Sequence, residues 1–186
     1  DHDHTDIYPT PEALEEALGQ FCSQSDLVIH HDGETLNGLT GASGSTSLRV
    51  GPAGELELLS IEKLSRGQQV QYRLGEQERS FRLPLRGRHQ ALNALLVLAL
   101  LRELGFDTTA IENALAEFSG VARRMETVLQ TGQGLLLDDY AHHPAEISAV
   151  LETLPSRTHV LFQSHTFTRT RDFAAEFARS LTAAVS

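Results

Sequence analysis

The chain has 186 residues, of which 40% are hydrophobic, and it carries a formal net charge of −10. Its length suffices for one large domain or two small ones. Its acidic balance argues against nucleic acid and anionic membranes as partners, because both repel negative charge. No apolar run approaches the roughly 18 to 20 residues that cross a bilayer, and no secretory signal is recognisable. The single cysteine, Cys22, excludes an internal disulfide and fits a reducing compartment, so we expect a cytoplasmic protein.

The first part of the sequence predicts a helix, a strand and a loop in turn. A threonine followed by proline and glutamate is typical of a helix N-terminus and predicts a helix over residues 11–24. An apolar run predicts a short strand within residues 26–31. The glycine- and serine-rich stretch 39–46 is expected to be a turn, and it lacks the Gly-Lys-Ser/Thr ending of a phosphate loop.

The middle of the sequence changes from a strand pattern to a helix pattern. Residues 48–85 alternate between apolar and polar side chains, which predicts strands of a small antiparallel sheet with a hairpin turn at 75–77. The pattern of residues 88–104 is that of a helix. Because residues 94–101 are apolar on every side, we expect this helix to be buried in a core. A second helix is expected over residues 108–117.

Two stretches near the end of the chain each combine a strand, a polar turn and a helix start. The apolar run 134–137 precedes the polar turn 138–143, and a helix is expected to begin at about Pro144. A second strand is expected over 159–162, followed by the polar turn 163–170. Open α/β sheets bind nucleotides and anions at such turns, so the two turns are predicted to form one site.

The charge is unevenly distributed along the chain. Residues 1–117 contain 18 acidic and 9 basic residues, whereas residues 118–186 contain 7 acidic and 6 basic residues. This shift indicates a domain boundary near Phe118. The arginines of the second part lie close to its two polar turns.

Several polar residues are candidates for binding, and each also has a purely structural interpretation. His89 and Asn93 lie one helical turn apart and could hydrogen-bond the edge of a heterocycle, or they could be satisfied polar residues at a helix start. The pair Arg123-Arg124 follows a glycine in a connection. It could bind phosphate in a forked geometry, or it could be a solvated basic pair.

Carboxylates and histidines raise the question of a metal site. Asp138 and Asp139 could hold a metal or a ribose diol, or cap the next helix. The adjacent pair His142-His143 diverges and has no third ligand spaced nearby, so we favour orientation or substrate contact over a zinc site. The alternating Asp and His residues of 1–6 resemble a metal cluster or an expression tag.

Five motifs follow one another along essentially the whole chain. They are Asp3-His4-Thr5-Asp6-Ile7-Tyr8, Gly87-Arg88-His89-Gln90-Ala91-Leu92-Asn93-Ala94, Phe118 to Glu126, Asp138 to Pro144 with Glu146, and Phe162 to Thr170. In their order and spacing these motifs resemble the Mur ligases of peptidoglycan assembly. The resemblance implies an α/β fold. It comprises the rear part of the central ATPase domain in residues 1–117, with a parallel sheet plus a small antiparallel sheet, and the first part of a Rossmann-like C-terminal domain in 118–186.

The histidine pair and the Phe-Gln-x-His stretch point to the alanine-adding member of this family. The resemblance implies that ATP and Mg²⁺ are used to join L-alanine to UDP-N-acetylmuramate through an acyl phosphate, in the bacterial cytoplasm. It also implies roles for individual residues. These are His4 for Mg²⁺; His89, Gln90 and Asn93 for the adenine; Arg124 for the phosphates; Asp139 for the ribose; and His142, His143, His165 and Arg169 for the muramoyl substrate and the amino acid, with Arg124, His142 and His143 as the catalytic group.

The sequence also departs from the family pattern. Gln90 replaces an asparagine, Ser164 replaces a proline, and Thr166 stands at a variable position. The family's sugar-nucleotide domain, Gly-Lys-Thr loop and magnesium-binding glutamate would fall before Asp1, so the chain resembles an internal segment. We expect it not to turn over ATP by itself, and to expose a sheet edge through which it could self-associate.

Two other functions remain open at this stage. One is a ligase that attaches a preformed tripeptide to the same sugar, against which the Phe-Gln-Ser-His-Thr stretch argues. The other is a non-catalytic module that binds a nucleotide or a partner.

Overall fold

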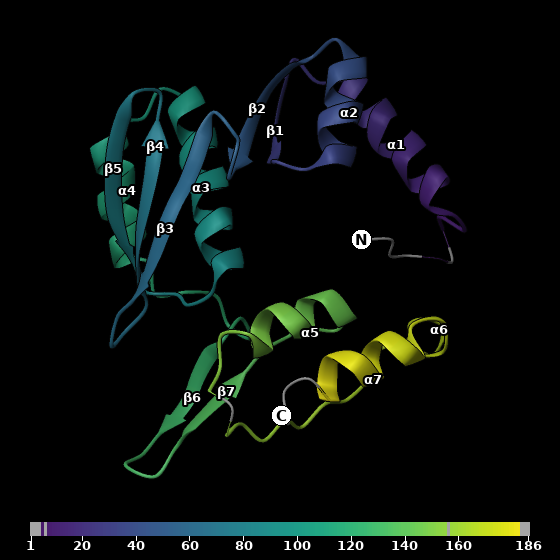
Figure 1. Cartoon of the computed structure of the whole chain (residues 1–186), viewed down its shortest axis with the longest axis vertical. Helices are drawn as coiled ribbons and strands as arrows, with labels where there is room; N and C mark the ends of the chain where they lie inside the picture. The colour runs from purple at the N-terminus through teal and green to yellow at the C-terminus, as the bar shows by residue number, and fades with distance from the viewer. Residues whose placement is uncertain (1–4, 6, 156, 183–186) are drawn as a thin grey trace. The chain divides into compact units, whose positions relative to one another are not determined.

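The computed structural model describes residues 5, 7–155 and 157–182, which form two compact units (Figure 1). One unit is Pro11–Ser119, and the other combines Asp1–Thr10 with Gly120–Ser186. No helix among the described residues is long and apolar enough to cross a membrane.

The unit Pro11–Ser119 contains one five-stranded mixed sheet. Its strands lie in the order of the sequence; the first three are parallel, and the third, fourth and fifth are antiparallel. The parallel and antiparallel parts that the sequence predicts are therefore two halves of a single sheet. Within the described residues β1 lies at an edge of that sheet, as expected. The strands are β1 (Leu27–His31), β2 (Thr46–Gly51), β3 (Leu56–Lys63), β4 (Gln68–Leu74) and β5 (Gln77–Leu83).

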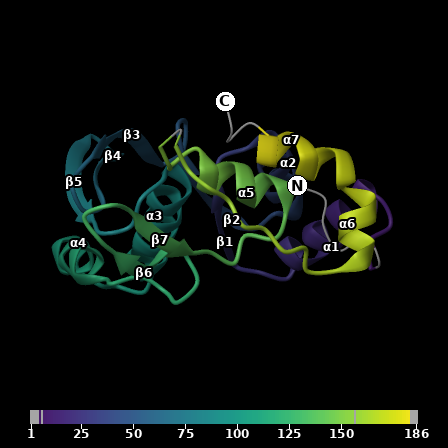
Figure 2. The same cartoon turned by 90° about the horizontal axis from the view of Figure 1, so that it is seen from below.

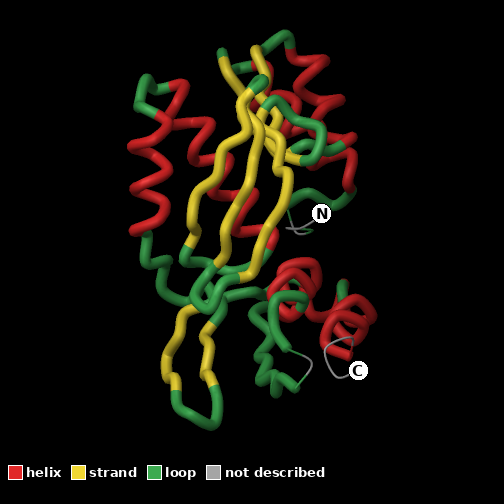
Figure 3. Tube along the Cα trace, turned by 60° about the vertical axis from the view of Figure 1, so that its left-hand side comes forward, coloured by secondary structure: helices red, strands yellow, loops and turns green. Residues whose placement is uncertain are grey.

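Helices pack on both sides of this sheet (Figure 3). Helix α3 packs against β1, β2 and β3, whereas α4 packs against β5 and α2 against β1 and β2. The core between sheet and helices contains Leu56, Tyr72 and Leu95, all of which are fully buried. The helices of this unit are α1 (Pro11–Ser23), α2 (Glu34–Ser43), α3 (Arg88–Glu103) and α4 (Thr108–Glu117).

A carboxylate joins α4 to the sheet. Glu112 accepts hydrogen bonds from the Tyr72 hydroxyl at 2.6 Å and from Arg79 Nε and Nη2 at 2.8 Å each. Burial raises the pKa of Glu112, but the hydrogen bonds from Arg79 and Tyr72 outweigh this effect and hold the pKa below its ordinary value. The carboxylate therefore stays charged while it satisfies the buried hydroxyl.

The predictions for α1, β1, the β4–β5 hairpin, α3 and α4 are confirmed, but three others are wrong. The antiparallel sheet expected over 48–85 does not include β2, which pairs in parallel with both β1 and β3. The stretch 39–46 is not a turn, because Leu39–Ser43 complete α2, which ends at Gly44 in the left-handed conformation. The glycine- and serine-rich sequence of this helix has a low intrinsic helix propensity. Tertiary packing, in which Thr40 is buried, stabilises the helix nevertheless. Helix α3 was expected to be buried on all sides, but only one of its faces packs against the sheet. Val97 and Leu100, on another face, are 44% and 50% exposed.

The described residues of the second unit form a two-stranded antiparallel sheet and three helices. Helices α5 and α7 pack against each other, as Figures 1 and 2 show. Strand β7 and the start of α5 at Pro144 confirm the predictions for these segments. The elements are β6 (Glu126–Gln130), β7 (Leu135–Asp138), α5 (Pro144–Leu151), α6 (Phe167–Asp172) and α7 (Ala174–Thr182).

The predicted strand over 159–162 is wrong. This segment has no regular secondary structure, and Leu161 is fully exposed. Its apolar sequence favours a strand, but a strand also needs a hydrogen-bonded neighbour. A cavity of about 580 Å³ is lined by this segment and by β7, which therefore do not pair.

Candidate functional site

The residues predicted to contact adenine lie on the first two turns of α3. His89 and Gln90 are half-buried, and Asn93, one turn later, is exposed. The helix begins after Gly87, whose peptide groups are paired with the side chain of Gln68. Gln68 Nε2 donates to Gly87 O at 2.9 Å, and Gly87 N donates to Gln68 Oε1 at 3.1 Å. Gln68 is only 2% exposed, so a buried amide fixes the point at which this helix begins.

A histidine that the sequence reasoning missed lies beside Asn93. Burial lowers the pKa of His31, and a side-chain hydrogen bond with Asn93 partly opposes this shift. His31 therefore stays neutral at pH 7 and has both a donor and an acceptor nitrogen. The signal that could have found it is its place at the carboxyl end of a parallel strand, where α/β sheets bind ligands.

The preceding histidine points to the opposite face of the sheet. His30 is 6% exposed, and its Nε2 lies 3.3 Å from Thr40 Oγ1 on α2. Its Nδ1 lies 2.8 Å from the carbonyl oxygen of His31. His30 is thus held in the interior by α2, while His31 interacts with α3.

The predicted phosphate-binding arginines lie in an unusual turn, which we call the arginine turn (residues 123–125). Arg123 and Met125 have φ angles of 59° and 54°, in the left-handed region that side chains rarely adopt. Each such residue costs roughly 1–2 kcal/mol. Asp139 accepts the Met125 N–H at 2.7 Å, and Arg123 O accepts the Tyr140 N–H at 2.8 Å. Backbone hydrogen bonds to the next strand end therefore stabilise the turn.

The two arginines have different surroundings. Arg123 Nε lies 3.5 Å from Asp138 Oδ2, and its guanidinium carbon is 4.7 Å from the centre of the Tyr140 ring. Arg124 is exposed, and its guanidinium carbon is 5.9 Å from the same ring. Among the described residues no carboxylate forms an ion pair with Arg124. Arg124, rather than Arg123, is therefore the cation available to an anionic ligand.

Two of the predicted substrate histidines gather around Tyr140. The His142 ring is 5.0 Å from the Tyr140 ring and 5.6 Å from the His165 ring, centre to centre. His142 Nδ1 lies 2.8 Å from the carbonyl oxygen of Tyr140. Because a carbonyl can only accept, Nδ1 carries the proton, and Nε2 of neutral His142 is an acceptor.

The other two predicted substrate residues are buried. His143 is 9% exposed, and its Nδ1 accepts the Ala145 N–H at 3.3 Å as the N-cap of α5. Glu146 completes this capping box by accepting the His143 N–H at 3.3 Å. Arg169 on α6 is also 9% exposed. The structure thus groups His142 with His165 and gives His143 a role at the helix start.

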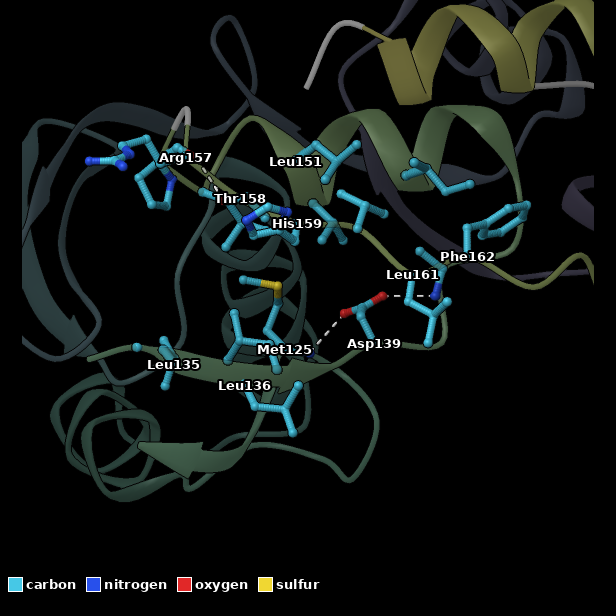
Figure 4. Close-up of a pocket in the computed structure, with 18 of the residues that line it drawn as sticks. Met125, Leu135, Leu136, Asp139, Leu151, Arg157, Thr158, His159, Leu161 and Phe162 are labelled. Carbon is cyan, nitrogen blue, oxygen red and sulfur yellow. Dashed lines mark hydrogen bonds between the residues drawn. The ribbon is translucent and has the colours of Figure 1, made fainter. Parts of the chain in front are cut away.

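Asp139, predicted to hold the ribose, has both carboxylate oxygens engaged. Oδ2 accepts the Met125 N–H, and Oδ1 accepts the Ala141 N–H at 2.8 Å (Figure 4). Each carboxylate oxygen has two lone pairs, so Asp139 can still accept a hydroxyl. Asp139 also lines the cavity of about 580 Å³, but side chains such as Leu136 and Leu151 make that cavity mainly apolar. The cavity therefore does not match a charged sugar nucleotide.

The structure does not test the predicted metal ligand. His4 lies outside the described residues. Its neighbour Thr5 donates from Oγ1 to Asp172 Oδ2 at 3.0 Å, which ties this segment to the end of α6. Within the described part of the chain, no group of three or more His, Cys, Asp or Glu side chains is arranged to hold a metal.

Comparison with known families identifies the class of protein. The Mur ligase middle domain matches residues 1–101, and the Mur ligase glutamate ligase domain matches residues 123–186. The chain therefore belongs to the Mur ligase family of ATP-dependent acid–amino-acid ligases. This result confirms the predicted fold class, a partial middle domain followed by the start of a C-terminal domain.

Individual proteins of this and related families are similar to most of the chain. The UDP-N-acetylmuramate–L-alanine ligase of Mycolicibacterium gilvum is 37% identical in an alignment of 201 positions, gaps included, that covers 98% of this chain. The chain spans 42% of the length of that relative. The structure of a UDP-N-acetylmuramate–alanine ligase from Thermotoga maritima matches with a TM-score of 0.74 and 28% identity, over 96% of this chain and 41% of that one. A folylpolyglutamate synthase from Mycobacterium tuberculosis, solved with ADP, matches with a TM-score of 0.56 and 26% identity, over 67% of this chain and 29% of that one.

Proposed function

We propose that these 186 residues are part of a ligase that joins L-alanine to UDP-N-acetylmuramate, with ATP converted to ADP. The observation that carries the proposal is the arrangement around Tyr140. There the imidazoles of His142 and His165 lie in one unit with Arg124, which forms no ion pair within the part of the chain that the structure describes. The alanine ligase from Mycolicibacterium gilvum, 37% identical, supports the choice of substrate. We assign residues 1–117 to the middle domain and 118–186 to the C-terminal domain.

We propose nucleotide-binding residues within each unit separately. Imidazole and amide groups suit the donor and acceptor edge of adenine. Arg124 suits the phosphates, because its planar guanidinium forms paired hydrogen bonds with oxyanions. Asp139 retains lone pairs for the ribose hydroxyls. The proposed adenine residues are His89, Gln90 and Asn93, to which His31 is added through its hydrogen bond with Asn93.

The proposed reaction activates the muramoyl carboxylate as an acyl phosphate, which the amine of L-alanine then attacks. Arg124 would neutralise charge on the transferred phosphoryl group. His142 Nε2, the acceptor nitrogen, suits removal of a proton from the attacking ammonium, and His165 suits contact with a substrate carboxylate. His143, the N-cap of α5, and Arg169, on α6, remain proposed contacts of the muramoyl substrate and the amino acid. His4 remains the proposed ligand of Mg²⁺, which would supply further charge neutralisation.

A chimera tests this proposal. The 186 residues replace the matching segment of the Mycolicibacterium gilvum ligase, and phosphate release is measured with UDP-N-acetylmuramate and L-alanine. We expect alanine-dependent turnover that Arg124→Ala reduces about 100-fold or more. The matched control Arg179→Ala, at an exposed arginine that forms an ion pair with Glu176, should change turnover by less than about threefold. A folded chimera without turnover, or equal losses in both variants, would refute the proposal.

The same assay separates the alternatives. Turnover with a tripeptide but not with L-alanine would indicate the ligase that attaches a preformed peptide. Titration of the chain with ATP and Mg²⁺ tests for a non-catalytic nucleotide-binding module, since we expect the 186 residues of the ligase segment by themselves to bind weakly or not at all. We also expect them not to turn over ATP. Alanine-dependent phosphate release from the 186-residue chain would contradict that expectation.

A further inference from the structure

The arginine turn requires contacts from outside itself. Arg123 and Met125, on either side of Arg124, both have positive φ angles, 59° and 54°. Neither is glycine, so the intrinsic preference of each residue is for another conformation. Without external partners the turn would relax, and Arg124 would lose its defined direction.

Two carboxylates supply these contacts. Glu126 Oε2 accepts the Arg123 N–H at 2.8 Å, and Asp139 Oδ2 accepts the Met125 N–H at 2.7 Å. The N–H groups on both sides of Arg124 are therefore bound by charged acceptors, which form stronger hydrogen bonds than neutral ones. Asp139 Oδ1 also accepts the Ala141 N–H at 2.8 Å, so the aspartate is itself oriented by the backbone.

We infer that Glu126 and Asp139 are positioning residues: they hold the arginine turn so that Arg124 projects beside Tyr140 toward the nucleotide phosphates. The inference rests on the proposed function only for the identity of the anion. Glu126 itself contacts the backbone of the turn and is not among the proposed ligand-binding residues. It acts through Arg124, and its removal leaves Arg124 chemically intact but without a fixed direction.

The test uses NMR on the full 186-residue chain without ligand. Glu126→Ala should speed hydrogen exchange of the Arg123 amide by about tenfold or more, and Asp139→Ala should do the same at Met125. Both should change the chemical shift of the Arg124 Nε–H signal, because the guanidinium carbon lies 5.9 Å from the centre of the Tyr140 ring and would lose this position. Glu126→Gln keeps an oxygen acceptor and should restore exchange at Arg123 to within about threefold of the wild type.

The control is Glu152→Ala, which removes the same charge from an exposed residue at the end of α5 and should leave all these signals unchanged. Unchanged exchange and an unchanged Arg124 signal in both alanine variants would overturn the inference. If Asp139→Ala fails to fold, Asp139→Asn decides. In the wild type the Met125 and Ala141 N–H groups donate to different oxygens of Asp139, and asparagine has an NH₂ group in place of one of them. Exchange should therefore rise at Met125 or Ala141, and no rise at either would overturn the inference.

A second arm adds ADP as the probe to the chimera with the Mycolicibacterium gilvum ligase, because the 186 residues by themselves are expected to bind nucleotide weakly or not at all. In the wild type, ADP should shift the Arg124 signal, and its affinity should fall about tenfold in Glu126→Ala and recover in Glu126→Gln. Binding that is equal in all three proteins would overturn the positioning role while leaving the proposed function intact. Absence of any ADP-induced shift at Arg124 in the wild type would count against the proposed function. The ligand-free exchange measurements would still decide whether the two carboxylates hold the turn.

Discussion

The buried amide of Gln68 should determine where α3 begins, and Gln68→Glu tests this role without changing the side-chain volume. The wild-type amide both donates to and accepts from Gly87, at 2.9 and 3.1 Å. A carboxylate keeps the acceptor but cannot donate. The substitution therefore places a charged oxygen against the Gly87 carbonyl oxygen at a position that is 2% exposed.

The expected loss of stability depends on pH. Burial beside a carbonyl should raise the pKa of the introduced carboxyl by about 2 units above its ordinary value of about 4.3. Because the folded pKa lies above the unfolded one, the variant is least destabilised when the carboxyl is protonated, and stability is lost as the pH rises through the folded pKa. At about 1.4 kcal/mol per pKa unit, plus a weakened hydrogen bond, we expect a loss of ~1.5 kcal/mol near pH 5 and ~3.5 kcal/mol near pH 8.

Urea unfolding followed by circular dichroism measures this loss. Hydrogen exchange of the Gln90 and Ala91 amides, which donate to Gly87 O at 3.1 and 3.2 Å, locates it at the start of α3. The matched control is Gln69→Glu, which adds the same charge one residue along the strand, where the side chain is only half-buried. Equal losses for Gln68→Glu and Gln69→Glu, or a loss that does not grow between about pH 5 and pH 8, would refute the reasoning.

Three further predictions concern the same unit. Gly67→Ala should destabilise the fold by ~3 kcal/mol or more and Gly75→Ala by only ~1 kcal/mol in urea unfolding. Both glycines have positive φ, but only at Gly67 would a Cβ lie 2.1 Å from a carbonyl oxygen at the end of β5, so equal losses would contradict the steric argument. Glu112→Ala should cost ~2–3 kcal/mol because the buried Tyr72 hydroxyl loses its acceptor, whereas Glu117→Ala on the same helix should stay within ~0.5 kcal/mol. A cost below ~1 kcal/mol for Glu112→Ala would show that the hydroxyl finds another partner. The free edge of β1 should make the chain self-associate at high concentration, and light scattering that finds a compact monomer throughout would exclude this.

Local patterns in the sequence predicted much of the fold. Proline at the first position of α1, the alternation of β4 and β5, and the helical period of α3 each depend on near neighbours in the chain. Such patterns remain readable without knowledge of tertiary contacts. The strand, turn and helix start around Pro144 were predicted for the same reason.

The remaining features depend on contacts that the sequence does not reveal. Helix α2 forms although Gly38 and Gly41 weaken it, because Thr40 packs in the interior. The apolar segment 159–162 lacks the neighbour that a strand requires. The sequence did not predict the role of Glu126 as an acceptor. That role depends on the positive φ of Arg123, and arginine is not a residue type from which a positive φ is expected.

The end of β1 contacts two helices, α2 and α3, which pack on opposite faces of the sheet. Successive side chains of a strand point to opposite faces, so His30 reaches Thr40 on α2 while His31 reaches Asn93 on α3. A slip of the strand by one residue would exchange the two imidazoles between the faces and break both interactions at once. The two imidazoles therefore help to fix the register of β1 in the parallel half of the sheet.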